Sequence, residues 1–202
     1  MSESNLIPLA STTLADHNTS EVVFTGIPNS ASSPNYERLK VVFSLRGGWG
    51  GTTGNWLRMR YGTGSGNASS SSYYSNVYFF GSGNNTPSIY NYYAQTDWTL
   101  GFITGYSSYS GWLHGSVDIL DWYAASNSVY SGATTKLLGA DAMTYGAGDA
   151  TGITDSTVYK SGHRNALGNT WSSLHFTLDG SWGTTWKFSA DSTFDLYGVE
   201  SA

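Results

Sequence analysis

Two segments near the ends of the chain alternate between apolar and polar residues, and this pattern constrains the fold more than any other feature. The first segment, Leu39–Arg46, reads LKVVFSLR and has an apolar residue at every second position. The second, Trp186–Val199, follows the same rule over most of its length. Period-two alternation places successive side chains on opposite faces of a strand, so each segment predicts a strand with one buried face. We therefore expect both ends of the chain to belong to one antiparallel fold.

The composition favours an all-β protein. Aromatic residues make up 15% of the 202 residues, glycines number 25, charged residues total only 11%, and helix formers such as Glu, Lys and Gln are scarce. Such a composition suits twisted strands joined by tight turns. About eight to ten short strands separated by turn residues predict an antiparallel β-sandwich, jelly-roll-like in type.

Several internal segments also predict strands. In Trp56–Tyr61 the alternation places the apolar residues on the buried face and the two arginines on the other. Residues 146–170 are polar and are expected to be irregular. The other predicted strands are Val22–Phe24, Ser116–Tyr123, Thr135–Ala140 and Ser173–Leu178.

The first twenty residues are polar apart from a short apolar run. We expect residues 1–20 to form an N-terminal arm or an edge strand, and residues 21–202 to form a single β-sandwich domain. The apolar side chains of the arm predict an anchor onto a neighbouring protein. This candidate anchor consists of Leu6, Ile7 and Leu9.

Charge and cysteine content limit the partners. The formal net charge is −5, and the nine lysines and arginines are scattered, whereas binding of phosphates requires clustered cations. We therefore expect no nucleic-acid partner, and no apolar stretch or basic helix predicts membrane binding. The N-terminal residues lack the pattern of a secretory signal, which predicts synthesis and folding in a cytoplasm. Without cysteine there is no disulfide and no thiolate metal site.

No residue pattern predicts catalysis, a metal site or a cofactor. Asp118 and Asp121 are three positions apart, so on a strand they lie on opposite faces and cannot act on one bond together. A Ser-His-Asp triad stays open, because its members need not be close in sequence, although no G-x-S-x-G motif supports one. We expect structural or solvated roles for the four histidines. These are His17, His114, His163 and His175.

A group of aromatic residues in the middle of the chain is the strongest candidate interaction surface. Tyrosine offers a large contact area with a polar tip, which suits both sugar stacking and protein interfaces. The alternative is that these rings fill the sandwich or a subunit interface. The candidate residues are Tyr73, Tyr74, Tyr92, Tyr93, Tyr106, Tyr109 and Trp112.

Several different short motifs follow one another along the chain. Phe24–Pro28 reads F-x-x-I-P, and Tyr36–Leu39 reads Y-x-x-L after an insert. Leu57–Asn67 begins with L-R and continues into glycines. Val117–Tyr123 contains I-x-D-Y with a tryptophan inserted, and Phe188–Val199 reads F-x-A-D-S-x-F-x-L-Y-G-V.

In this order the motifs resemble a family of small β-rich bacteriophage virion proteins, usually encoded among structural and tail genes. The family pattern runs from F-x-x-I-P-x-x-Y-x-x-L to F-x-A-G-S-x-F-x-L-Y-G-I. This chain departs from it at Asp191, which replaces a glycine, and in the Leu57–Asn67 segment, where the family's Asn and Asp are replaced. The resemblance covers most of the chain, and it implies a virion component without enzymatic activity.

The expected function is therefore that of a non-enzymatic structural protein of the virion, made in the host cytoplasm. It is expected to form a symmetric homo-oligomer that contacts other virion proteins, on the tail or baseplate or elsewhere on the particle surface. Two alternatives are a capsid decoration (cement) protein and a module that binds host glycan through the aromatic residues. A glycan-cleaving enzyme would need two neighbouring carboxylates, and the sequence shows no such pair.

Overall fold

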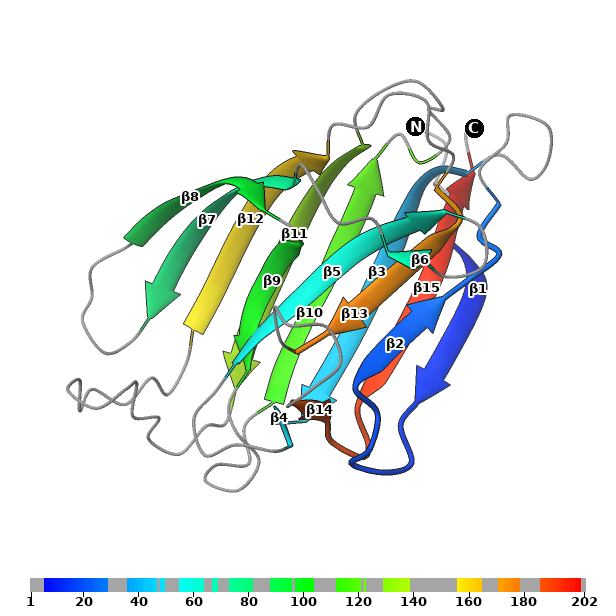
Figure 1. Ribbon diagram of the computed structural model, residues 1–202, viewed down its shortest axis with the longest axis horizontal. Helices are drawn as coiled ribbons and strands as arrows, with labels where there is room; N and C mark the ends of the chain where they lie inside the picture. The colour runs from blue at the N-terminus through cyan, green and yellow to red at the C-terminus, as the bar shows by residue number, and fades with distance from the viewer. Residues whose placement is uncertain are drawn as a thin grey trace.

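Antiparallel strands account for all the regular structure in the described part of the computed structural model, which contains fifteen strands and no helix (Figure 1). This confirms the predicted all-β class. The structure describes residues 6–28, 36–46, 48–49, 55–63, 67–68, 73–81, 88–95, 97–103, 112–120, 122, 129–138, 156–164, 171–178 and 186–200.

The larger sheet has eight strands and contains both ends of the described chain. Its strand β15 lies between β1 and β3, so the expectation that the two ends belong to one fold is confirmed (Figure 1). In spatial order the strands are β1 (Leu6–Thr13), β15 (Thr193–Glu200), β3 (Tyr36–Arg46), β10 (Trp112–Leu120), β11 (Val129–Leu138), β12 (Ser156–Arg164), β7 (Tyr73–Gly81) and β8 (Ser88–Gln95).

The smaller sheet has five strands and lies in front of part of the larger one (Figure 1). Its path runs from β2 (Glu21–Phe24) through β13 (Ser173–Thr177) and β5 (Asn55–Thr63) to β6 (Asn67–Ala68), and β9 (Trp98–Ile103) also pairs with β5. A short third pair joins β14 (Lys187–Phe188) to β4 (Gly48–Trp49).

The two sheets face each other across an apolar core, in a sandwich-like arrangement. Phe176 of β13 and Phe194 of β15 meet there, with their ring centroids 5.2 Å apart. The four apolar positions of the alternating segment in β3 are all buried, as predicted. These are Leu39, Val41, Phe43 and Leu45. Burial of each such side chain stabilises the fold by roughly 1.5–3 kcal/mol, which is why the alternation decides which face turns inward.

The alternation in β5 is confirmed as well. Leu57, Met59 and Tyr61 are buried in the core, and the two arginines lie on the opposite face. The tilted ring of Trp171 lies 5.7 Å from that of Tyr61, and Trp122 lies 6.3 Å away on another side. Aromatic contacts of this kind add to the stabilisation from burial alone.

The expectation of an irregular segment at residues 146–170 is wrong for part of that range. Residues Ser156–Arg164 form β12, which pairs with both β11 and β7. The strand was missed because it is rich in polar residues, and its pairing with two neighbours supplies the order that its own sequence does not indicate. The expected strand count of eight to ten is also too low: the described residues form fifteen strands, of which three have only two residues each.

Candidate functional site

The predicted tyrosine surface is divided among separate elements. Tyr73 and Tyr74 belong to β7, while Tyr92 and Tyr93 belong to β8. Across the regular β7–β12 pair, Tyr73 is opposite Arg164 and Tyr74 is opposite His163. In the β7–β8 pair Tyr73 is opposite Gln95 and Tyr92 is opposite Ser75, with a register shift between Tyr73 and Ser75. Tyr106 and Tyr109 lie outside the described residues.

Trp112, the last member of the predicted surface, begins β10 on the outer face of the larger sheet. Its ring is partly buried and stacks on the exposed His114, with centroids 5.9 Å apart and planes within 10° of parallel. Arg46 is its partner in β3. The two stacked rings therefore form an aromatic feature on the outer face of the larger sheet.

The three residues of the candidate anchor lie in β1, at one edge of the larger sheet. Leu6 is 50% exposed, whereas Ile7 and Leu9 pack partly buried against the core of their own chain. Ile7 and Leu9 therefore contribute to the sandwich itself, and Leu6 remains at the surface.

A groove of about 390 Å³ runs between β1 and β2, the neighbouring edges of the two sheets. Leu9 to Thr12 form one wall, residues 23–28 form the other, and Leu196 lies between them. None of the eleven residues that line the groove is charged. The groove is therefore suited to an uncharged segment of chain.

A chain of hydrogen bonds joins Ser173, His175 and Glu21. The imidazole Nδ1 of His175 lies 2.8 Å from Glu21 Oε1, and its Nε2 lies 3.1 Å from Ser173 Oγ. An ionised carboxylate only accepts hydrogen bonds, so Nδ1 carries a proton, and in the neutral ring Nε2 accepts the hydroxyl proton of Ser173. This connectivity is that of a catalytic triad with a glutamate as the acid.

The burial of this triad-like group favours a structural role. Ser173 is completely buried, with 0% exposure, and His175 is 1% exposed, so no substrate reaches the hydroxyl. A nucleophile needs its oxygen open to the reacting carbon, within about 3 Å. The three residues therefore satisfy one another's polar groups inside the protein, and the expected structural role of His175 fits this geometry.

A second buried polar group lies beside the first, on the same face of the smaller sheet. Asp97 is 2% exposed, and its carboxylate lies 2.6 Å from Arg58 Nη1 and 3.8 Å from Arg60 Nη2. Across the β5–β13 pair, Arg60 is opposite His175 and Arg58 is opposite Thr177. The arginines predicted to face away from the core thus pair with a buried carboxylate, and that pairing offsets the cost of taking charges out of water.

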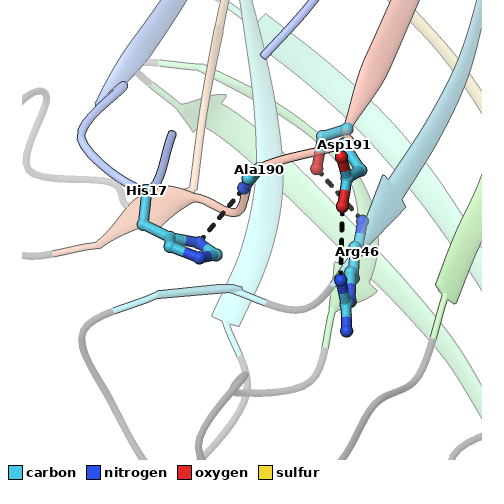
Figure 2. A network of polar contacts seen from close by, with 5 residues as sticks. His17, Arg46, Ala190 and Asp191 are labelled. Atoms are coloured by element: carbon cyan, nitrogen blue, oxygen red, sulfur yellow. Dashed lines mark hydrogen bonds and ion pairs between the residues drawn. The ribbon is translucent and has the colours of Figure 1, made fainter. Parts of the chain in front are cut away.

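Figure 2 shows a third polar network, where the turn before β15 meets the link between β1 and β2. Arg46 Nη1 lies 3.3 Å from Asp191 Oδ2, and the backbone N–H of Ala190 donates to His17 Nδ1 at 3.1 Å. Because Nδ1 accepts, the proton of the neutral His17 ring is on Nε2. Beside this network, the backbone N–H of Leu14 donates to the carbonyl oxygen of Ser192, and the N–H of Asp191 donates to the carbonyl oxygen of Leu14.

Several residues of the short sequence motifs make defined contacts within the fold. The ring of Tyr36 covers Gly198, so that a Cβ added at Gly198 would lie 2.3 Å from a ring carbon of Tyr36. The Nε1–H of Trp122 donates to the backbone oxygen of Pro28 at 2.8 Å. Asp191 has a φ of 68°, in the left-handed region that glycine adopts most readily. That is the position at which the phage pattern has a glycine.

Sequence reasoning missed the roles of Glu21, Asp97 and Asp191. Glu21 and His175 are 154 positions apart, and only the strand register brings them together. Asp97 precedes β9 without any motif around it. The one available signal was at Asp191, because aspartate is among the few residues that readily adopt a left-handed conformation in a turn.

Comparisons with known proteins found no similar protein: no protein-family model, curated protein or solved structure matches the chain. Among the described residues, no three histidine, aspartate or glutamate side chains are grouped so that they could hold a metal ion. The same residues include no helix that is long and apolar enough to cross a membrane.

Proposed function

We propose that this chain is a non-enzymatic structural protein of a bacteriophage particle, which assembles with copies of itself and with other virion proteins. The observation that carries the proposal is the role of the motif residues. Tyr36 packs on Gly198, Pro28 accepts a hydrogen bond from Trp122, and Asp191, where the pattern has a glycine, has a left-handed φ of 68°. Tyr36, Pro28 and Gly198, which match the phage pattern, therefore make packing and hydrogen-bond contacts within the fold, as expected of a scaffold.

The buried polar groups support the same proposal. An enzyme needs its reactive groups open to substrate, whereas Ser173, His175 and Asp97 are each no more than 2% exposed. Under this proposal the sandwich is jelly-roll-like, and residues 1–20 act as an arm or edge toward a neighbouring protein. The proposed location is the tail or baseplate, or the particle surface more broadly, with capsid decoration as the alternative position.

Purified particles of the phage that encodes this chain provide the test. We expect mass spectrometry to find the chain in stoichiometric amounts, and electron microscopy to trace it either on the tail or across the capsid lattice. Density on the tail supports a tail component, and density repeated over the capsid supports a decoration protein. Absence of the chain from intact particles would contradict the proposal.

Host-glycan binding is a second candidate function, and one observation favours it. The stacked rings of Trp112 and His114 form a flat aromatic feature at the outer sheet face, and sugars pack on such surfaces. A Trp112→Ala variant should reduce adsorption to host cells while particles still assemble. Val42→Ala, at an exposed residue of the same face, is the matched control. Unchanged adsorption of the Trp112 variant would exclude these rings as the glycan site.

A further inference from the structure

We propose that β1 pairs, antiparallel, with the β1 strand of a second copy of this chain. The pairing would extend the eight-stranded sheet through its free edge and cover the groove beside it. This inference rests on the proposed homo-oligomeric function and names the surface through which the copies meet.

The edge formed by β1 is open to strand pairing. Within the described part of the chain, β1 pairs only with β15, so one side of its backbone has no strand partner. Its eight residues, LIPLASTT, carry no charge. Natural edge strands are usually protected from pairing with another chain by a charge, a proline or a bulge; β1 lacks the charge, and its Pro8 and the bulge after it protect only its first half.

The neighbouring edge, β2, is less suited to pairing. It has only four residues, and it begins with the charged Glu21, whose carboxylate is held by His175. Gly26, with a φ of 67°, and Pro28 follow it, and both interrupt an extended strand. Of the two neighbouring edges, β1 is therefore better suited to pair with a strand of another chain.

The usable part of β1 is its second half. Pro8 has no N–H to donate, and the register with β15 shifts between Pro8 and Ala10. Ala10–Thr13 remain as a regular stretch, and Leu9 to Thr12 form one wall of the groove. A partner strand would lie along this stretch.

The chemistry of the groove fits a second β1. Its lining has no charge, and the buried side chains of Phe24, Ile27 and Leu196 contribute to it. Val23, in the same lining, is 38% exposed, and Leu6 on β1 is 50% exposed. An uncharged strand such as β1 would cover these apolar side chains without burying a charge.

Symmetry also favours a second copy as the partner. Two antiparallel copies of one strand are related by a two-fold axis, so each copy makes the same contacts and the assembly closes. The nearest acidic group, Asp195 on β15, is held by the Ser11 hydroxyl at 2.6 Å. Its symmetry mate would be three strand spacings away, about 14 Å, which exceeds the screening length of about 8 Å at physiological salt.

Light scattering of the full chain gives the first test. We expect the wild-type protein to form a dimer, or an even-numbered oligomer built from dimers. Ala10→Lys, at an exposed position of the free edge, should raise the dimer dissociation constant on the order of a hundredfold, because it brings two like charges into an otherwise uncharged strand pair. Val42→Lys, at an exposed position of β3, should leave it unchanged.

Cysteine cross-linking gives the second test. Because the chain has no native cysteine, any disulfide must form at the introduced residue. Single replacements by cysteine at Leu9, Ala10, Ser11, Thr12 and Thr13 sample every register of the pair. At least one of them should form a disulfide-linked dimer under mild oxidation, since paired strands bring Cα atoms to within about 4.4–6.8 Å. Val42→Cys should remain monomeric under the same oxidation.

The outcomes separate this proposal from the proposed function. A wild-type monomer at all concentrations, or an oligomer that is insensitive to Ala10→Lys and forms no β1 cross-link, overturns the pairing. Association through β8, the opposite edge of the sheet, would give the second result. In either case, detection of the chain in purified particles would leave the virion function intact.

Discussion

The two faces of strand β13 are equally buried but chemically opposite. On one face, Leu174 and Phe176 belong to the apolar core between the sheets. On the other, Ser173, His175 and Thr177 are no more than 1% exposed and lie among charged partners. One strand therefore contributes to two interiors, one held by apolar packing and the other by hydrogen bonds and ion pairs.

The difference shows that alternation determines which face a residue belongs to but leaves burial undetermined. A polar face is expected to meet water in a sandwich, and here it does not. The buried polar layer is stable only while each group keeps its partner, because a lone charge or donor inside a protein is costly. An apolar core tolerates the loss of a contact in proportion to the cavity left behind.

Phe176→Ala should produce the largest effect, on the apolar face. It removes a buried ring that contacts Phe24 and Phe194, at centroid distances of 6.2 and 5.2 Å. We expect the free energy of unfolding to fall by about 4 kcal/mol, as measured by urea denaturation followed through tryptophan fluorescence. Val42→Ala, at an exposed residue, should change it little. A small loss for the Phe176 variant would mean that the core is not shared between the sheets.

Asp97→Asn should come next, on the polar face. It leaves Arg58 and Arg60 beside a neutral side chain, and removal of one partner from a buried ion pair destabilises by about 3 kcal/mol. The same urea titration measures the loss. Asp118→Asn, in an ion pair of which both side chains are about a third exposed, is the control. Equal effects for the two aspartates would show that the polar layer is open to water.

Ser173→Ala should have a moderate effect, of about 1 kcal/mol. It removes the hydroxyl next to His175 Nε2 and leaves that nitrogen buried without this partner. A fluorophosphonate probe should not label the wild-type protein at Ser173, because the hydroxyl is fully buried. Labelling at Ser173 that is lost in the alanine variant would instead identify a working nucleophile and revive the triad interpretation.

Lys40→Ala should have the smallest effect, of about 0.5 kcal/mol or less, because exposed ion pairs contribute little. Lys40 Nζ lies 3.6 Å from Asp118 Oδ2 on the outer face of the larger sheet. Added salt should reduce even this contribution while leaving the effect of Asp97→Asn largely unchanged. Stability curves at low and high salt check both expectations.

Much of the fold could be predicted from local patterns. The burial of Leu39, Val41, Phe43 and Leu45 follows from their spacing, because a strand with one buried face turns every second side chain inward. β12 could not be predicted in this way. Its order depends on pairing with β11, the strand before it, and with β7, which is distant in sequence.

The candidate site depended on distant pairing to a greater degree. His175 could be placed on the polar face of its strand, but its contact with Glu21 follows from the register between β13 and β2. Nearness in sequence groups the tyrosines, whereas the register of β7 with β8 and β12 decides which residues they meet. Contacts set by register need the fold before they can be assigned.

The position of β15 between β1 and β3 determines when this protein can fold. β3 ends at residue 46 and takes one of its two neighbours from residues 193–200. A ribosome therefore makes almost the whole described chain before β3 can complete its hydrogen bonds. Long-range pairing of this kind slows folding, and until then β1 and β3 expose strand edges to other chains. During synthesis, nascent copies would therefore need protection from pairing with one another through these edges, most of all where many copies are made at once.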